Sequence, residues 1–388
     1  MKNIDSNIIA MGWVSFFTDM ASSMVTTLLP IFVVYVLDES VEKLGYIIAI
    51  ATFVSYSLRI VFGYLSERYG IVKPFILFGY LLSAITKPLL GFANSYGDVA
   101  ALRSFERVGK AMRSASKDAL ISYYSQKKAE GKSFGLHKMM DVSGEMFGSV
   151  IIVMLFLSVS LDDSLLIRHI FEWTLLPGML GVLIILFFVK DMKKPPKSHK
   201  LVIVKADYRL LWMLGSYFLF LLFFMSDQYF ILHAKSLGMT MVEIPLLVIV
   251  STLTQAVLSY YSGLIIDKTG SKSVLFIASV FGILSLLALK NNFIWMAFVL
   301  FGIFNVTSLN AMRTYIAVNA LSKAFVYGVF YAGIAVFSAL GALIVGFIWG
   351  DYGFVYAVDF SLGGSFLISM GLFFVLLKDY YKRSSKLK

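Results

Sequence analysis

Two kinds of residue that most chains use freely are missing or scarce in this sequence. Its 388 residues include no cysteine, which excludes disulfides, thiolate metal sites and cysteine nucleophiles. Charged residues make up only 15% of the chain, against about 25% in a soluble domain, and 59% are hydrophobic. With a mean hydropathy of +0.82, the chain cannot hide its apolar surface from water by folding alone. Since long apolar runs cross a bilayer as helices, the sequence predicts an all-α integral membrane protein.

Sequence motifs for chemistry are missing too. There is no glycine-rich Lys-Ser/Thr loop that could cradle a nucleotide phosphate, which excludes ATP as the direct source of energy. The sequence has no Ser-His-Asp arrangement of defined spacing and no metal-ligand cluster of the usual spacing. We therefore expect no enzymatic activity, no cofactor and no metal centre.

What the chain does contain is a series of long apolar runs, each close to the roughly 20 residues that cross a bilayer. The short N-terminal segment leads into the first run without a small-residue cleavage site, so we expect a spanning helix there and no signal peptide. The expected spanning helices are residues 9–36, 43–65, 73–94, 97–120, 133–159, 167–189, 208–233, 242–266, 272–290, 293–318, 324–349 and 353–377.

Basic residues gather in every second connection and in the C-terminal tail, whereas the other connections are acidic or mixed. Because Lys and Arg concentrate on the cytoplasmic side, both termini and the central loop are expected to be cytoplasmic. The same rule accounts for the net charge of +11 without any nucleic-acid partner. The basic stretch 191–207 is the expected cytoplasmic linker between an N-terminal half, 1–190, and a C-terminal half, 208–388.

One loop sequence occurs twice, at 63–70 and 263–270, and we call the two copies the doubled loop. Each copy reads Gly, three residues, acid, base, one residue, Gly, at the end of an apolar run. Two similar halves with charged hairpins are typical of secondary transporters. We interpret the loop as a gate element, in which the first glycine allows close helix approach and the last allows a tight turn. The candidate gating residues are Gly63, Glu67, Arg68, Gly70, Gly263, Asp267, Lys268 and Gly270, with Arg113 and Arg313 at the same offset of 200.

The doubled loop resembles the signature of the major facilitator superfamily. Further stretches are similar to one bacterial branch of it: Phe16–Met24, Arg107–Arg113, Lys117–Ile121, Gly131–Asp141 and Ser226–Leu232. The resemblance implies twelve spanning helices in two pseudo-symmetric six-helix bundles, in a bacterial inner membrane. It also implies transport of a drug, a siderophore or a metabolite. The branch usually has acids where Ser23 stands and within 309–312, so no role of those acids is carried over.

Charged residues at membrane depth are the candidate substrate contacts, because each costs at least about 2.5 kcal/mol to insert and so usually faces a cavity or a partner. Arg103 and Arg107 share one helical face, as do Glu106 and Lys110. This arrangement fits either a structural salt-bridge ladder or an Arg-lined carboxylate site with Glu106 as its counter-ion. The candidate substrate contacts are Asp19, Ser22, Arg103, Arg107, Asp227, Asn305 and Asn310.

Three titratable residues follow one another on a single stripe of the helix 133–159. His137, Asp141 and Glu145 stand at i, i+4 and i+8, and imidazole and buried carboxyl groups can change protonation near neutral pH. We interpret the stripe, together with Glu106, as candidate proton-coupling residues. The alternative is that His137 marks the cytoplasmic end of the helix and Asp141 pairs with a nearby base.

The leading hypothesis is a proton-coupled secondary active transporter that works by alternating access and moves a small organic solute. The many buried bases favour an anionic or carboxylate-bearing solute such as a siderophore or an organic acid. The close alternative is a multidrug exporter of lipophilic cations, since Asp19, Glu106 and Asp227 could serve cations. A non-transporting receptor or a lipid-remodelling protein is the alternative of another class. The expected partners are the substrate, protons and the lipid bilayer, and the chain is expected to act as a monomer.

Overall fold

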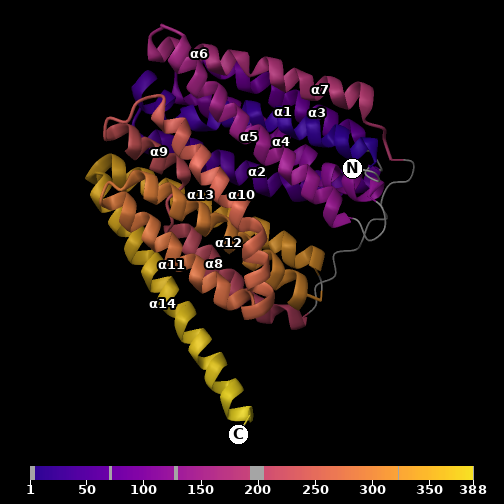
Figure 1. The fold of residues 1–388 in the computed structure, drawn as a ribbon, viewed down its shortest axis with the longest axis vertical. Coiled ribbons are helices and arrows are strands. Elements are labelled where there is room, and N and C mark those ends of the chain that lie inside the picture. The colour runs from indigo at the N-terminus through magenta and orange to yellow at the C-terminus, as the bar shows by residue number, and fades with distance from the viewer. Residues whose placement is uncertain (1–4, 70–71, 126–129, 193–204, 322, 388) are drawn as a thin grey trace. The chain divides into compact units, whose positions relative to one another are not determined.

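A computed structural model describes residues 5–69, 72–125, 130–192, 205–321 and 323–387, and these contain helices and no strands (Figure 1). The chain divides into two compact units. The first holds Met1–Lys200 and Gly238–Ile249, and the second holds Leu201–Leu237 and Val250–Lys388. The segment 193–204, which makes up most of the expected linker, lies outside the described residues.

The first unit is built from long helices packed along one another. The helices α1, α3 and α7 pack together, α5 lies against α1, and α4 lies against both α2 and α3. The elements are α1 (Ser6–Ile31), η1 (Phe32–Val36), α2 (Val41–Tyr69), α3 (Lys73–Leu89), η2 (Leu90–Phe92), α4 (Tyr96–Tyr124), α5 (Glu130–Ser158), α6 (Asp163–Trp173) and α7 (Leu175–Phe188).

In the second unit, α11 packs on α12 and α14, and α13 packs on α8 and α14. The elements that follow α7 are η3 (Lys205–Leu210), α8 (Leu211–Phe223), α9 (Asp227–Ser236), α10 (Glu243–Thr269), α11 (Ser271–Lys290), α12 (Ile294–Asn319), α13 (Lys323–Tyr352) and α14 (Phe354–Leu387). The residues of α10 before Val250 group with the first unit.

Eleven helical segments among the described residues are long and apolar enough to cross a membrane. The helix α4 is not one of them, although it has 29 residues and covers the run expected at 97–120. Its charged residues lower its hydropathy, so length and apolarity alone do not assign it as a span. An all-helical membrane protein with several spans is confirmed. The expected number of twelve spans stays a prediction, because α4 is not among the eleven segments.

Two of the expected helices are each interrupted. The run 167–189 is divided at Thr174 into α6 and α7, because Pro177 has no N–H with which to continue the helical hydrogen bonds. The run 208–233 is divided between Phe223 and Asp227, where Ser226 is the N-cap of α9. A Ser-Asp pair after an apolar run is a helix-start signal. Each run still forms one membrane-length segment, Asp163–Phe188 and Asp207–Ser236, so the predicted spans hold although the helix within each is interrupted.

Glycines set how closely the helices of the first unit approach. Gly144 and Gly148 of α5 lie against the carbonyl oxygens of Phe16 and Met20 of α1, where an added Cβ would overlap them. Their spacing is the small-residue pattern of close helix pairs in membranes. Ser23 and Ser149 join the same two helices by a hydrogen bond of 2.9 Å. The contact places the stripe of His137, Asp141 and Glu145 beside α1.

We expect Gly144→Ala to destabilise the protein by about 1–3 kcal/mol, because the new methyl group forces α5 away from α1. The matched control is Gly135→Ala in the same helix, where a Cβ would meet no atom within 4 Å. Thermal unfolding of the two purified variants in detergent measures the difference. Equal melting temperatures would contradict close packing at Gly144.

Candidate functional site

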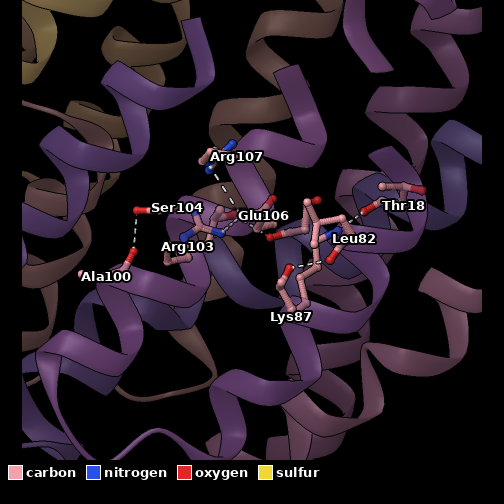
Figure 2. A network of polar contacts seen from close by, with 11 residues as sticks. Thr18, Leu82, Lys87, Ala100, Arg103, Ser104, Glu106 and Arg107 are labelled. Carbon is pink, nitrogen blue, oxygen red and sulfur yellow. Dashed lines mark hydrogen bonds and ion pairs between the residues drawn. The ribbon is translucent and has the colours of Figure 1, made fainter. Parts of the chain in front are cut away.

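The most deeply buried charges form a network on α4 (Figure 2). Arg103 and Glu106 are 1% and 2% exposed, and they form an ion pair one turn apart. Arg107 Nε lies 3.7 Å from the same Glu106 oxygen, so the carboxylate has a guanidinium on each side. The sequence pattern predicted charged pairs four residues apart, whereas the contacts follow i, i+3 and i, i+1.

Lys87 of α3 is a further buried cation beside this network. Its side chain is 1% exposed, and its Nζ donates a hydrogen bond of 3.4 Å to the carbonyl oxygen of Thr18 in α1 (Figure 2). This carbonyl belongs to the residue before Asp19. The contact therefore connects α3 to the acidic position of α1.

A polar cavity of about 240 Å³ opens between α1, α3, α4 and α5. Four basic and three acidic side chains line it, so its charge is slightly positive and both signs face the same space. Four of these residues were candidate site residues: Asp19, Asp141 and Glu145 at the substrate and proton sites, and Arg113 as a gating residue. The full lining is Ser15, Asp19, Tyr80, Lys110, Arg113, Ser114, Lys117, Lys138, Asp141 and Glu145.

One wall of this cavity is a chain of polar contacts that we call the α1–α5 relay. His137 Nδ1 lies 3.5 Å from Asp141 Oδ1, and His137 Nε2 lies 2.7 Å from Ser15 Oγ. The Ser15 hydroxyl lies 3.5 Å from the Tyr80 hydroxyl. The His137 side chain is 6% exposed and that of Asp141 is 18% exposed. The Ser15 contact is a hydrogen bond, whereas the Asp141 contact has only ion-pair distance, so the histidine can pass a proton between the two once the Asp141 side chain moves closer.

Arg113 lies next to Tyr80, the last residue of the relay. Its guanidinium lies 4.2 Å from the centre of the Tyr80 ring, and the side chain is buried. Gly79 and Gly109 bring these residues together, because a Cβ on either one would stand 2.6 Å from the other's carbonyl oxygen. The close crossing of α3 and α4 therefore positions Arg113 over Tyr80 at the cavity.

Comparison with known proteins gives the family. The sequence profile of the Major Facilitator Superfamily matches residues 11–250, more than half of the chain. The chain therefore belongs to the major facilitator superfamily. A similar relative is an uncharacterised MFS-type transporter of Methanocaldococcus jannaschii, which is 30% identical over 369 residues and covers 90% of this chain and 89% of the relative.

Solved structures of other superfamily transporters have the same fold. A POT family transporter in complex with a thioalcohol-conjugated peptide has a TM-score of 0.80 at 10% identity, over 96% of each chain. A D-xylose-proton symporter has a TM-score of 0.67 at 16% identity, over 95% of this chain and 96% of the other. At these identities the likeness concerns the fold. This superfamily member is thus a membrane transporter whose substrate has to be inferred from its own residues.

The remaining candidate substrate contacts lie elsewhere. Ser22 is half-buried, and its carbonyl oxygen accepts a hydrogen bond from Thr26. Asp227 is the exposed first residue of α9, where its carboxylate accepts from Ser226 Oγ and from the Gln228 N–H. Asp19 lies within the continuous α1 and lines the polar cavity.

The two candidate asparagines of the second unit connect neighbouring helices. Asn305 donates to Gln255 Oε1 at 3.2 Å, and Asn310 donates to Ser262 Oγ at 2.8 Å. Both bonds join α12 to α10. In this conformation their amides hold helices together, and their role in substrate binding stays a prediction.

The first copy of the doubled loop is described only in part. Gly70 and the Glu67 side chain lie outside the described part of the chain, and Gly63 lies within α2. Arg68 is exposed, and its guanidinium lies 5.9 Å from the Tyr69 ring centre. Near this copy, α2 is joined to α4 through Arg59 and Asp118 at 3.4 Å and through Ser66 and Ser116 at 2.8 Å.

The second copy agrees with the expected turn at one glycine. Gly270 has φ of +86°, a conformation that favours glycine. Asp267 and Lys268 are exposed, and a Cβ at Gly263 would meet no atom within 4 Å, so close packing does not explain that glycine in this conformation. Arg313 is exposed, unlike the buried Arg113 at the same offset.

Sequence reasoning missed several residues at this site. Lys87 stands alone in an apolar run before Pro88, and a lone lysine at membrane depth was the available signal. Ser15 and Tyr80 are ordinary residues of spanning helices, and only the helix packing brings them to His137. Lys117 and Lys138 lie in basic stretches that the topology rule had already explained.

Proposed function

We propose that this protein is a proton-coupled secondary transporter of a small anionic or carboxylate-bearing organic solute, such as an organic acid or a siderophore. The observation that carries the proposal is the polar cavity, with four bases and three acids beside the α1–α5 relay. In this proposal twelve spans form two six-helix bundles, with both termini on the cytoplasmic side of an inner membrane.

The charges of α4 support its role as the twelfth span. Arg103 and Glu106 are buried within the first unit and paired with each other, so they do not face lipid. The helix is also 29 residues long, more than the roughly 20 needed to cross a bilayer. A charged helix can therefore span the membrane as an inner member of the bundle.

The cations along α4 support an anionic solute. Lys110, Arg113 and Lys117 lie about one turn apart on one side of the helix, and all three line the cavity. A carboxylate entering here can take ammonium and guanidinium donors at once. A volume of about 240 Å³ is below the size of a typical ligand pocket, so we assign it the charged end of the solute.

The acids support proton coupling. Asp141 is connected through His137 to Ser15 and Tyr80, while Asp19 and Glu145 face the same cavity. Glu106 contacts two guanidinium groups, which stabilise its ionised form and disfavour proton uptake. The relay is therefore the better candidate for the proton carrier. In this mechanism a proton on Asp141 or His137 raises the positive charge around the anion and strengthens its binding.

A ligand screen by thermal shift on the purified protein tests the proposal, from about pH 5.5 to about pH 8, where imidazole titrates. The panel contains organic acids, carboxylate siderophores and lipophilic cations. We expect an organic anion to stabilise the wild type, and Lys117→Gln to weaken that binding by about tenfold through loss of a charged hydrogen-bond donor. The control is Lys190→Gln, an exposed lysine of the same unit. Stabilisation by cations that survives in Lys117→Gln would overturn the anion proposal and favour multidrug export.

A further inference from the structure

A second short pattern repeats in the sequence, at the end of α7 and within α14. Val189-Lys190-Asp191-Met192 and Leu377-Lys378-Asp379-Tyr380 both follow an apolar run, and both lead into further basic residues. The offset is 379 − 191 = 188. The helices that follow the two copies of the doubled loop, α3 and α11, are the matching neighbours in the two units.

In the first unit the aspartate of this pattern caps the N-terminus of α3. The helix α7 ends at Phe188, and Asp191 Oδ1 accepts a hydrogen bond of 3.1 Å from the N–H of Lys73, the first residue of α3. Lys73 Nζ donates back to the Leu186 carbonyl at 3.2 Å, and the Tyr124 hydroxyl donates to the Asp191 carbonyl at 2.9 Å. A carboxylate at this place satisfies an orphan N–H and the positive end of the helix dipole.

In the second unit the corresponding place is the start of α11. The helix α14 continues to Leu387 and extends past the other helices of its unit (Figure 1). The helix α11 starts at Ser271 after Gly270, and among the described residues no side chain caps it. Beside this start lies a groove of about 730 Å³, polar at the first turn of α11 and apolar where Phe373, Leu376 and Leu377 of α14 line it.

We propose that this groove is the docking site of the chain's own C-terminal segment, 378–388. In the docked state α14 ends near Leu377, as α7 ends at Phe188, and the Asp379 carboxylate accepts a hydrogen bond from the Ser271 N–H. The repeated Lys-Asp pattern argues for this occupant, because the same pattern makes the same contact in the first unit. The segment also begins next to the groove, because it directly follows Leu376 and Leu377, which line the groove.

The docked segment ties the second copy of the doubled loop to the end of α14. Asp267, Thr269 and Gly270 of that copy line the groove, so an occupant there restrains them. The continuous helix and the docked segment are then two states of the same chain. This inference rests on the repeat and the groove, and it does not depend on the proposed substrate or on proton coupling.

Hydrogen exchange of the full-length protein in lipid nanodiscs tests the docking. We expect Asp379→Ala to speed exchange in the first turn of α11 about fivefold, the effect of losing a helix cap. Exchange at the start of α3 stays unchanged in this variant. The matched control is Asp191→Ala, which speeds exchange at the start of α3 and leaves α11 as it was.

An unchanged first turn of α11 in Asp379→Ala would overturn the proposal, whatever Asp191→Ala does. Protection that depends on anionic lipid in the nanodisc and persists without Asp379 would also overturn it, and would assign the groove to a lipid headgroup. An unchanged melting temperature of Asp379→Ala shows that the fold is intact. A variant that ends at Leu377 is expected to expose the same amides as Asp379→Ala.

Discussion

Asp141→Asn is expected to lose accumulation driven by a pH gradient by at least about tenfold, while exchange of solute at equal pH continues. Asparagine keeps the size and the polar contacts of aspartate but cannot gain or lose a proton. In the proposed mechanism Asp141 ends the α1–α5 relay, with His137 Nδ1 at 3.5 Å and Ser15 beyond it. Uptake of the anion found by thermal shift into proteoliposomes, with and without an imposed pH gradient, measures the loss.

The control for this prediction is Asp163→Asn, an exposed aspartate at the start of α6. It removes the same charge from the same unit without touching the relay. Accumulation by Asp141→Asn at the wild-type level would assign proton coupling to other residues. Loss of both accumulation and exchange would assign Asp141 to solute binding and not to the proton.

Glu106→Gln is expected to lower the free energy of unfolding by about 3–5 kcal/mol, because it leaves a buried guanidinium without its counter-charge. Arg103 is 1% exposed, so water cannot replace the lost carboxylate. The control is Asp359→Asn, whose partner is Lys290. These side chains are 47% and 37% exposed, and such a pair contributes at most about 1 kcal/mol. Denaturant unfolding followed by tryptophan fluorescence in detergent gives both values.

The same residues separate the two interpretations of α4. If Arg103 and Glu106 form only a structural pair, the double variant Arg103→Met/Glu106→Met recovers most of the stability and still transports. If Arg103 also contacts the solute, the double variant folds but does not transport. Wild-type stability of Glu106→Gln alone would contradict the structural role.

Hydropathy predicted the membrane class and most of the helices, because a run of apolar residues requires lipid wherever it lies in the chain. The breaks at Thr174 and Phe224 depend on one proline and one Ser-Asp pair within such runs. Hydropathy averages over a whole run, so it does not detect where single residues interrupt the helix. The helix α4 shows the opposite case. Its run at 97–120 was predicted with the others, although its charges keep it below the apolarity of the other spans.

The site was predictable where its residues share one helix. His137, Asp141 and Glu145 follow helical spacing, and the structure places Asp141 and Glu145 at the cavity and His137 in the relay beside it. Ser15, Tyr80 and Lys87 come from two other helices, and their positions depend on glycine contacts such as that of Gly79 with Gly109. Such contacts depend on how the helices cross. The spacing of residues along a single helix does not determine that crossing.

The most direct test of proton-coupled anion transport is the internal pH of proteoliposomes when the anion found by thermal shift is added outside. Vesicles of wild type carry a trapped pH dye, with no imposed gradient at the start. The account predicts that entry of the anion acidifies the interior, and that a protonophore abolishes this acidification. Entry of the anion at constant internal pH, without the protonophore, would contradict the account.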